Sequence, residues 1–125
     1  MTIHADAQAL LEQYARAYRV GDTDGCAAIF TDDSILYSPY APSARGRAAI
    51  AALHRDWTAG VGHAKTLTVL QAGSSGDLGW CLAAYSGGDV TDAGTSLCVL
   101  ARQPDGDWLV RICSLSADAP PLAGP

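Results

Sequence analysis

The stretch LLEQYARAYRVGDTDGCAAIFTDDSILYSP, residues 10–39, contains the signals for two helices and a strand in succession. Apolar side chains recur in its first part at the three- and four-residue spacing of one helix face. Gly21 suits the left-handed position that ends a helix, and the Asp22 side chain can accept hydrogen bonds from the first amides of the next helix. A short strand is expected over residues 34–38, after the turn-forming pair Asp32-Asp33, and Pro39 ends it. Because helices this short are not stable alone, both must pack against another part of the chain.

The rest of the chain predicts one further helix and then a series of strands. Residues 49–57 repeat apolar side chains at helical spacing. Strand-like segments follow at residues 65–72, 78–86, 95–102 and 108–116. This order indicates an α+β fold in which a bent sheet packs against three helices and leaves a pocket between the layers. We expect one domain over residues 1–125, with a core over about residues 7–118 and a tail over residues 119–125.

Composition limits the classes of function. Apolar residues make up 49% of the chain and charged residues 17%, as in a globular protein. The net charge of −5 and the scattered basic residues argue against nucleic acid or an anionic membrane as a partner. The N-terminus lacks the profile of a signal peptide, and no segment approaches the about 18 apolar residues of a membrane span. We therefore expect a cytoplasmic location and no cofactor.

The four cysteines are Cys26, Cys81, Cys98 and Cys113. They show neither CxxC spacing nor a histidine at the spacing of a metal site, so no metal is expected. One cysteine lies in a predicted helix and three lie in the middle of predicted strands. Without an export signal, buried free thiols are favoured over two disulfides.

A series of short motifs runs along the chain in a fixed order: Tyr14, Tyr18, Gly21-Asp22, Phe30, Asp32-Asp33, Pro39, Gly46-Arg47, Ile50 and Asp105-Gly106-Asp107-Trp108. Together they resemble the nuclear transport factor 2-like superfamily, in its SnoaL-like and ketosteroid isomerase-like branch, over about residues 10–118. The resemblance implies a cone-shaped α+β barrel, with three N-terminal helices packed in a strongly bent, mainly antiparallel sheet. It also implies a homodimer formed through the outer sheet face. Because this scaffold hosts isomerases, cyclases, hydrolases and non-catalytic modules, the resemblance specifies the fold better than the reaction.

Two residues are the candidate catalytic groups. The resemblance places Tyr14 where ketosteroid isomerases carry a tyrosine that donates a hydrogen bond to the oxyanion of an enolate, a role that suits a neutral phenol. His54 falls where some of these enzymes carry a second tyrosine that supports the first, and a histidine can also act as a general base. The alternative is that Tyr14 is a core tyrosine and that His54 is a satisfied core or rim residue.

The resemblance also implies which residues face the pocket. On the strands these are the alternate positions Trp80, Leu82, Ala84, Ser96, Cys98, Leu100, Arg111, Cys113 and Leu115. Alternation fixes which residues share a face but not which face points inward. The predicted substrate-binding residues are Tyr18, Ser38 and Trp57 together with six of these strand positions, namely Trp80, Leu82, Cys98, Arg111, Cys113 and Leu115. Two orientations of Arg111 are compatible with the sequence. It is either an inward cation that needs an anionic partner or an outward charge at an edge or interface.

Three positions depart from the isomerase pattern. Ser38 occupies the place of the aspartate that moves the proton, and Cys98 lies near the place of a protonated aspartic acid that donates to the oxyanion. Cys113 stands where many SnoaL-like proteins carry an acidic residue. A serine hydroxyl cannot take a carbon-bound proton near neutral pH without a base behind it. Steroid isomerisation by the familiar mechanism is therefore not expected.

Two functions stay open. The first is a small-molecule enzyme of isomerase, cyclase or hydratase type that acts on an apolar ring or polyketide-like substrate in a hydrophobic pocket. It depends on Tyr14 and His54 projecting into one cavity. The second is a non-catalytic ligand-binding or dimerisation domain of the same fold, which the missing carboxylates favour. It predicts a homodimer that binds hydrophobic ligands without turnover.

Overall fold

The computed structural model describes residues 2–59, 64–87 and 93–118. Within these ranges the helices are α1 (Ile3–Arg19), α2 (Thr23–Ala27) and α3 (Arg47–Thr58). The strands are β1 (Phe30–Tyr37), β2 (Ala44–Arg45), β3 (Thr66–Ser75), β4 (Leu78–Ser86), β5 (Ala93–Arg102) and β6 (Trp108–Ala117). The predicted tail, residues 119–125, lies outside the described residues. No helix in the described ranges is long and apolar enough to cross a membrane.

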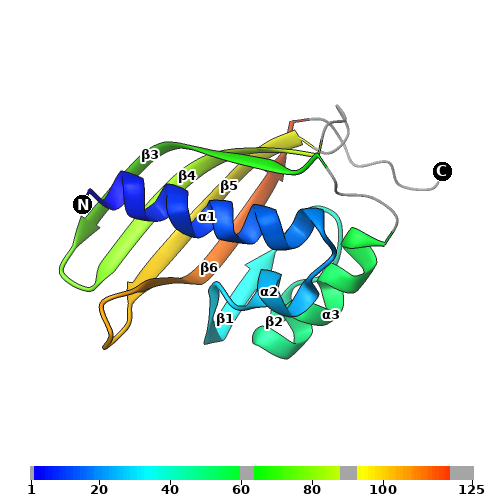
Figure 1. The fold of residues 1–125 in the computed structure, drawn as a ribbon, viewed down its shortest axis with the longest axis horizontal. Coiled ribbons are helices and arrows are strands. Elements are labelled where there is room, and N and C mark those ends of the chain that lie inside the picture. Colours follow the sequence, from blue (N-terminus) through cyan, green and yellow to red (C-terminus); the bar gives the residue numbers. More distant parts are fainter. Residues whose placement is uncertain (1, 60–63, 88–92, 119–125) are drawn as a thin grey trace.

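The strands form one six-stranded sheet in the order β2-β1-β6-β5-β4-β3. Neighbouring strands are antiparallel except for β1 and β6, which run parallel. The sheet curls around α1, while α2 and α3 lie near β1 and β2 (Figure 1). The predicted α+β cone of three helices in a bent, mainly antiparallel sheet is thus confirmed, and the strand order shows that the sheet stays open between β2 and β3.

Local signals at the helix ends orient α1 against the sheet. The Asp22 side chain caps α2 by accepting a hydrogen bond from the Gly25 amide at 3.0 Å, as predicted. Gly21, at φ 70°, occupies the left-handed position between the two helices. The buried face of α1 comprises Ala7, Leu10, Leu11, Tyr14, Ala15 and Tyr18. This stripe points both tyrosines into the space between helix and sheet.

Strand β4 presents the opposite face from the one predicted. Its buried residues are Gly79, Cys81, Ala83 and Tyr85, and the Trp80 side chain is 42% exposed. The prediction that Trp80, Leu82 and Ala84 point inward is therefore wrong. The inner face is crowded at this level, because a Cβ atom at Gly79 would lie 3.2 Å from the Trp108 ring. Only a small residue fits there, so the indole of its neighbour lies on the outside.

Strand β6 changes its alternation at Arg111. Val99 pairs with Ile112 and Leu100 pairs with Val110, which leaves Arg111 as the extra residue of a bulge. Val110 and Cys113 consequently both point toward the core, although they are an odd number of residues apart. The Arg111 guanidinium forms an ion pair with Asp33 of β1, with Nε 3.2 Å from Oδ2.

Strand β1 begins earlier than residue 34, where the sequence predicts it. Asp32 and Asp33 fall inside the strand and are exposed, at a register irregularity between Phe30 and Ile35. Their turn-forming composition hides the strand from a reading of the sequence.

Candidate ligand-binding site

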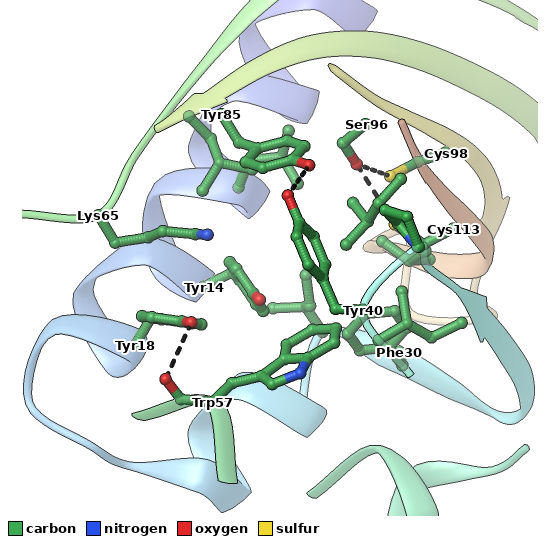
Figure 2. Close-up of a pocket in the computed structure, with 17 residues that line it drawn as sticks. Tyr14, Tyr18, Phe30, Tyr40, Trp57, Lys65, Tyr85, Ser96, Cys98 and Cys113 are labelled. Atoms are coloured by element: carbon green, nitrogen blue, oxygen red, sulfur yellow. Dashed lines mark hydrogen bonds between the residues drawn. The ribbon is translucent and has the colours of Figure 1, made fainter. Parts of the chain in front are cut away.

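A cavity of about 460 Å³ lies between the helices and the inner sheet face. Figure 2 shows aromatic side chains from helices, strands and the loop after β1 converging on it. The lining residues are Leu11, Tyr14, Tyr18, Ile29, Phe30, Leu36, Pro39, Tyr40, Trp57, Lys65, Leu67, Tyr85, Ser96, Cys98, Val110, Cys113 and Leu115. Its size is within the roughly 300–1,000 Å³ of typical small-molecule sites.

Tyr14 and His54 lie together, with the Tyr14 hydroxyl 2.7 Å from His54 Nε2. The direction of this hydrogen bond follows from the other ring nitrogen. His54 Nδ1 lies 2.7 Å from the carbonyl oxygen of Ile50, which can only accept, so Nδ1 carries the proton. Burial lowers the pKa of His54 to about 4, so the ring is neutral near neutral pH and Nε2 accepts from the Tyr14 hydroxyl.

This arrangement reverses the polarity expected for Tyr14. Its proton is directed toward His54, so the phenol offers oxygen lone pairs rather than a donor to the cavity. Burial also raises the pKa of Tyr14 well above its ordinary value, which keeps the phenol neutral. The geometry therefore does not support Tyr14 as a ready-made oxyanion donor.

His54 is fully buried and lies behind Tyr14, outside the lining of the cavity. Its ring packs against the rings of Tyr14, Tyr18 and Trp57 at centroid distances of 5.4, 5.9 and 5.0 Å. In this place the imidazole orients the Tyr14 phenol and does not reach a molecule in the cavity. It is a positioning residue.

Lys65, the only lysine of the chain, is the charged group that sequence reasoning missed. It is 7% exposed and lines the cavity just before β3. Its Nζ atom lies 4.6 Å from the ring centroid of Tyr18 and 4.9 Å from that of Tyr85, so two aromatic faces hold the ammonium. A signal existed, because Lys65 precedes β3 at the same alternate spacing as Leu67 and Val69, both of which are buried.

Tyr40 and Tyr85 form a second aromatic pair on the cavity wall. Their hydroxyl oxygens lie 2.7 Å apart, and the Tyr40 ring packs edge-on against Trp57 at 6.2 Å (Figure 2). This pair joins the loop after β1 to β4 and α3. Sequence reasoning missed Tyr40 because that segment reads as a loop, and it missed Tyr85 because it chose the wrong face of β4.

A row of thiols crosses the inner sheet face. Cys81 of β4 pairs with Cys98 of β5, which pairs with Cys113 of β6. The Ser96 hydroxyl oxygen lies 3.4 Å from the Cys98 sulfur and 3.3 Å from the Cys113 sulfur. All four cysteines are buried and free. The described residues contain no group of three or more ligands arranged to hold a metal ion.

The predicted substrate-binding residues divide into two groups. Those that line the cavity are Tyr18, Trp57, Cys98, Cys113 and Leu115. Those that do not line it are Ser38, Trp80, Leu82 and Arg111. The Ser38 hydroxyl accepts a hydrogen bond from the Tyr40 amide at 3.2 Å, which uses it in the turn after β1.

The SnoaL-like domain family matches residues 11–109 of this chain. The chain belongs to the SnoaL-like domain family. No curated protein sequence matches it. The predicted resemblance is thereby confirmed, and small-molecule binding or isomerase-type chemistry is the kind of function that this SnoaL-like fold suggests.

Solved structures share the fold of this SnoaL-like domain. A ketosteroid isomerase-like protein from Erwinia carotovora atroseptica is 23% identical, with a TM-score of 0.79 over 94% of this chain and 97% of that one. ActVI-ORFA from Streptomyces coelicolor is 24% identical, with a TM-score of 0.61 over 91% and 96% of the two chains. A putative calcium/calmodulin-dependent protein kinase type II association domain from Thiobacillus denitrificans is 20% identical, with a TM-score of 0.72 over 89% and 94%. At these identities the likeness concerns the fold alone.

Proposed function

We propose that this SnoaL-like domain binds an apolar, ring-containing small molecule that carries a negatively charged or strongly polarised oxygen, and that Lys65 pairs with that oxygen. One observation carries the proposal. Among the described residues that line the cavity, Lys65 is the one charged side chain, and it stands among aromatic and aliphatic groups.

The preference for a ring follows from the walls. Phe30, Tyr40, Trp57 and Tyr85 offer ring faces and edges, against which flat molecules pack with a gain beyond simple area burial. Aliphatic groups from α1 and the strands complete the lining. A flexible polar ligand would leave its hydrogen-bonding groups unpaired in such a place, at a cost of about 1–3 kcal/mol for each group.

The preference for a negative oxygen follows from the ammonium. Lys65 is buried, and at a buried position the attraction between opposite charges is several times stronger than in bulk solvent. The faces of Tyr18 and Tyr85 lie against Nζ and hold it at the cavity wall. Carboxylates, phenolates and enolates on an apolar skeleton all meet this requirement, and polyketide-like molecules contain such groups.

Calorimetric titration with two ligands of the same shape tests the proposal. Naphthoate carries the negative oxygen, and naphthalenemethanol replaces it with a neutral hydroxyl group. We expect naphthoate to bind about tenfold more tightly than the alcohol, and Lys65→Met to remove this difference. Arg55→Met, which deletes an exposed positive charge on α3, is the control and should leave both affinities unchanged. Failure of naphthoate to bind, or equal loss in both variants, would refute the proposal.

Isomerase- or cyclase-type catalysis on the same class of molecule is the second candidate, and Lys65 is also the observation that favours it. A buried ammonium at the cavity wall stabilises an enolate oxygen as its charge develops. The described lining residues include no carboxylate and no histidine, so the proton would have to be taken by another group, such as a thiol. Deuterium uptake by an enone in deuterium oxide, faster than in buffer and lost in Lys65→Met, would support catalysis. Deuterium uptake at the rate seen in buffer would rule out this catalysis, and ligand binding would be the remaining function.

We further propose a homodimer formed through the outer sheet face. Trp80 and Leu97 are 42% and 49% exposed on neighbouring strands, so apolar groups are contiguous there. Trp80→Glu should convert a dimer to a monomer in sedimentation velocity. Val20→Glu, at an apolar position that is 78% exposed beyond the end of α1, is the matched control and should not. A monomeric parent protein would refute this assembly.

A further inference from the structure

Cys98 occupies the central position in the row of thiols formed by Cys81, Cys98 and Cys113. Cys98 lies on the middle strand of the three, so Cys81 flanks it on one side and Cys113 on the other. The Ser96 hydroxyl approaches it from two residues earlier on the same strand face. The central sulfur can therefore accept hydrogen bonds from two thiols and one hydroxyl, while the outer sulfurs have fewer such neighbours.

Access distinguishes the cysteines further. Cys98 and Cys113 line the cavity, whereas Cys81 and Cys26 do not. Cys26 lies on the short helix α2 and is fully buried in the core. A molecule in the cavity thus meets two sulfurs. Both lie near the Ser96 hydroxyl, but only Cys98 has a paired cysteine on each side.

We propose that Cys98 is a nucleophile that captures an α,β-unsaturated carbonyl compound held in the cavity and forms a thioether with it. This inference rests on the proposed function, because the same apolar walls must first bind the compound. It narrows the ligand class to enones and related unsaturated carbonyls, whose oxygen becomes an enolate during the reaction and is then a partner for an ammonium such as that of Lys65.

The addition of the Cys98 thiol to the enone requires no further reactant. The Cys98 sulfur bonds to the β-carbon of the enone, and the electron pair of the carbon–carbon double bond moves through the α-carbon onto the carbonyl oxygen. The proton lost by the thiol returns to the α-carbon when the enolate collapses to the ketone. Ser96 is within reach of both cavity sulfurs, so its hydroxyl can pass this proton along the row.

The pKa values of the thiols also favour Cys98 as the nucleophile. Hydrogen bonds from Cys113 and from Cys81 lower the pKa of the Cys98 thiol below its ordinary value, against the opposing effect of burial. The hydrogen bond to Cys98 and burial raise the pKa of Cys113, and burial raises the pKa of Cys26 to about 12. Nucleophilic attack requires the thiolate, so reactivity should concentrate on the central residue.

Benzylideneacetone, an aromatic enone, is the probe for this reaction. The folded protein is incubated with it, and adducts are located by intact-mass measurement and peptide mapping. We expect one adduct in the parent protein, on Cys98, and total adduct formation about tenfold slower in Cys98→Ser, where only the other thiols remain. Cys26→Ser serves as the control and should react like the parent protein. The saturated analogue benzylacetone cannot accept a thiol and should slow the reaction by competing for the cavity.

Three outcomes would overturn the inference: no adduct, an adduct mainly on another cysteine, or a rate that benzylacetone does not change. Circular dichroism of each variant checks that it is folded, and Cys98→Ala provides a second variant if the serine hydroxyl disturbs the packing. Naphthoate titration of the same preparation reports separately on the proposed function. Naphthoate binding without a Cys98 adduct overturns the thiol inference alone, whereas failure of naphthoate to bind overturns the proposed function.

Discussion

Acid should destabilise this fold through His54, and replacing that residue with glutamine isolates the effect. The native pKa of His54 is about 4 because the ring is buried, whereas its ordinary value is 6.5. Between these values the unfolded chain binds a proton that the native protein does not. Stability is therefore fully present above about pH 6.5 and is lost as the pH falls to about 4, after which both states are protonated.

The size of the effect follows from the same two values. Each pH unit within the window removes about 1.4 kcal/mol of unfolding free energy, so the whole window removes about 3 kcal/mol. This is a large fraction of the roughly 5–15 kcal/mol that stabilises a typical domain. Within the described part of the chain, a proton on Nε2 would also face only the Tyr14 oxygen, which directs its own proton to that nitrogen in the native protein.

Urea denaturation at a series of pH values measures this prediction. The carboxylates titrate in both the parent protein and His54→Gln, so the difference between their unfolding free energies reports on the imidazole. We expect the advantage of the parent to shrink by about 3 kcal/mol between about pH 7 and about pH 4. His4→Gln, at an exposed position on α1, is the control and should follow the parent. Parallel curves for parent and His54→Gln would refute the reasoning, with protein concentration held constant throughout.

Three further substitutions test the packing around the site. Tyr14→Phe leaves His54 Nε2 buried without its donor and should cost about 1–3 kcal/mol in urea denaturation; unchanged stability would show that the hydrogen bond is dispensable. Gly94→Ala places a Cβ atom against the Ser116 carbonyl oxygen and should cost about 1–3 kcal/mol, seen as a lower melting temperature; an unchanged melting temperature would contradict the close approach of β5 and β6. Asp22→Ala removes the cap of α2 and should cost about 1 kcal/mol, whereas Asp22→Asn should retain most of it; equal losses would argue against capping.

The parts of the fold that depend on short-range chemistry could be predicted from the sequence. Gly21 and Asp22 mark the boundary between α1 and α2 because a left-handed residue and a side-chain cap involve only a few neighbours. The orientation of β4 could not be predicted, since alternation is the same for either face. It is decided by the space that Trp108 leaves at Gly79, a contact between residues far apart in the chain. The bulge at Arg111 escapes prediction for the same reason.

Some features of the site could likewise be predicted from the sequence, and others could not. Helical spacing and the family resemblance bring Tyr14 to His54, but the direction of their hydrogen bond depends on the Ile50 carbonyl, which holds the proton of the other ring nitrogen. Predicting the importance of Lys65 required recognising that the lone lysine, just before β3, is buried on the same side as Leu67 and Val69. A lysine just before a strand is usually taken to be exposed. The alternation of buried residues at Val69 and Leu67 has to be extended back to Lys65 to see that this lysine is buried.

The burial of the only lysine gives the chain an internal reporter of opening. An endoprotease specific for lysine has a single peptide bond to cut, the one after Lys65, and in the native protein that side chain lies against two tyrosine rings. Cleavage requires β3 to unfold locally. The rate at which the two fragments appear therefore measures how often the cavity opens. A molecule that binds inside should slow that cut, and such protection can be followed on a gel without any knowledge of what the molecule is.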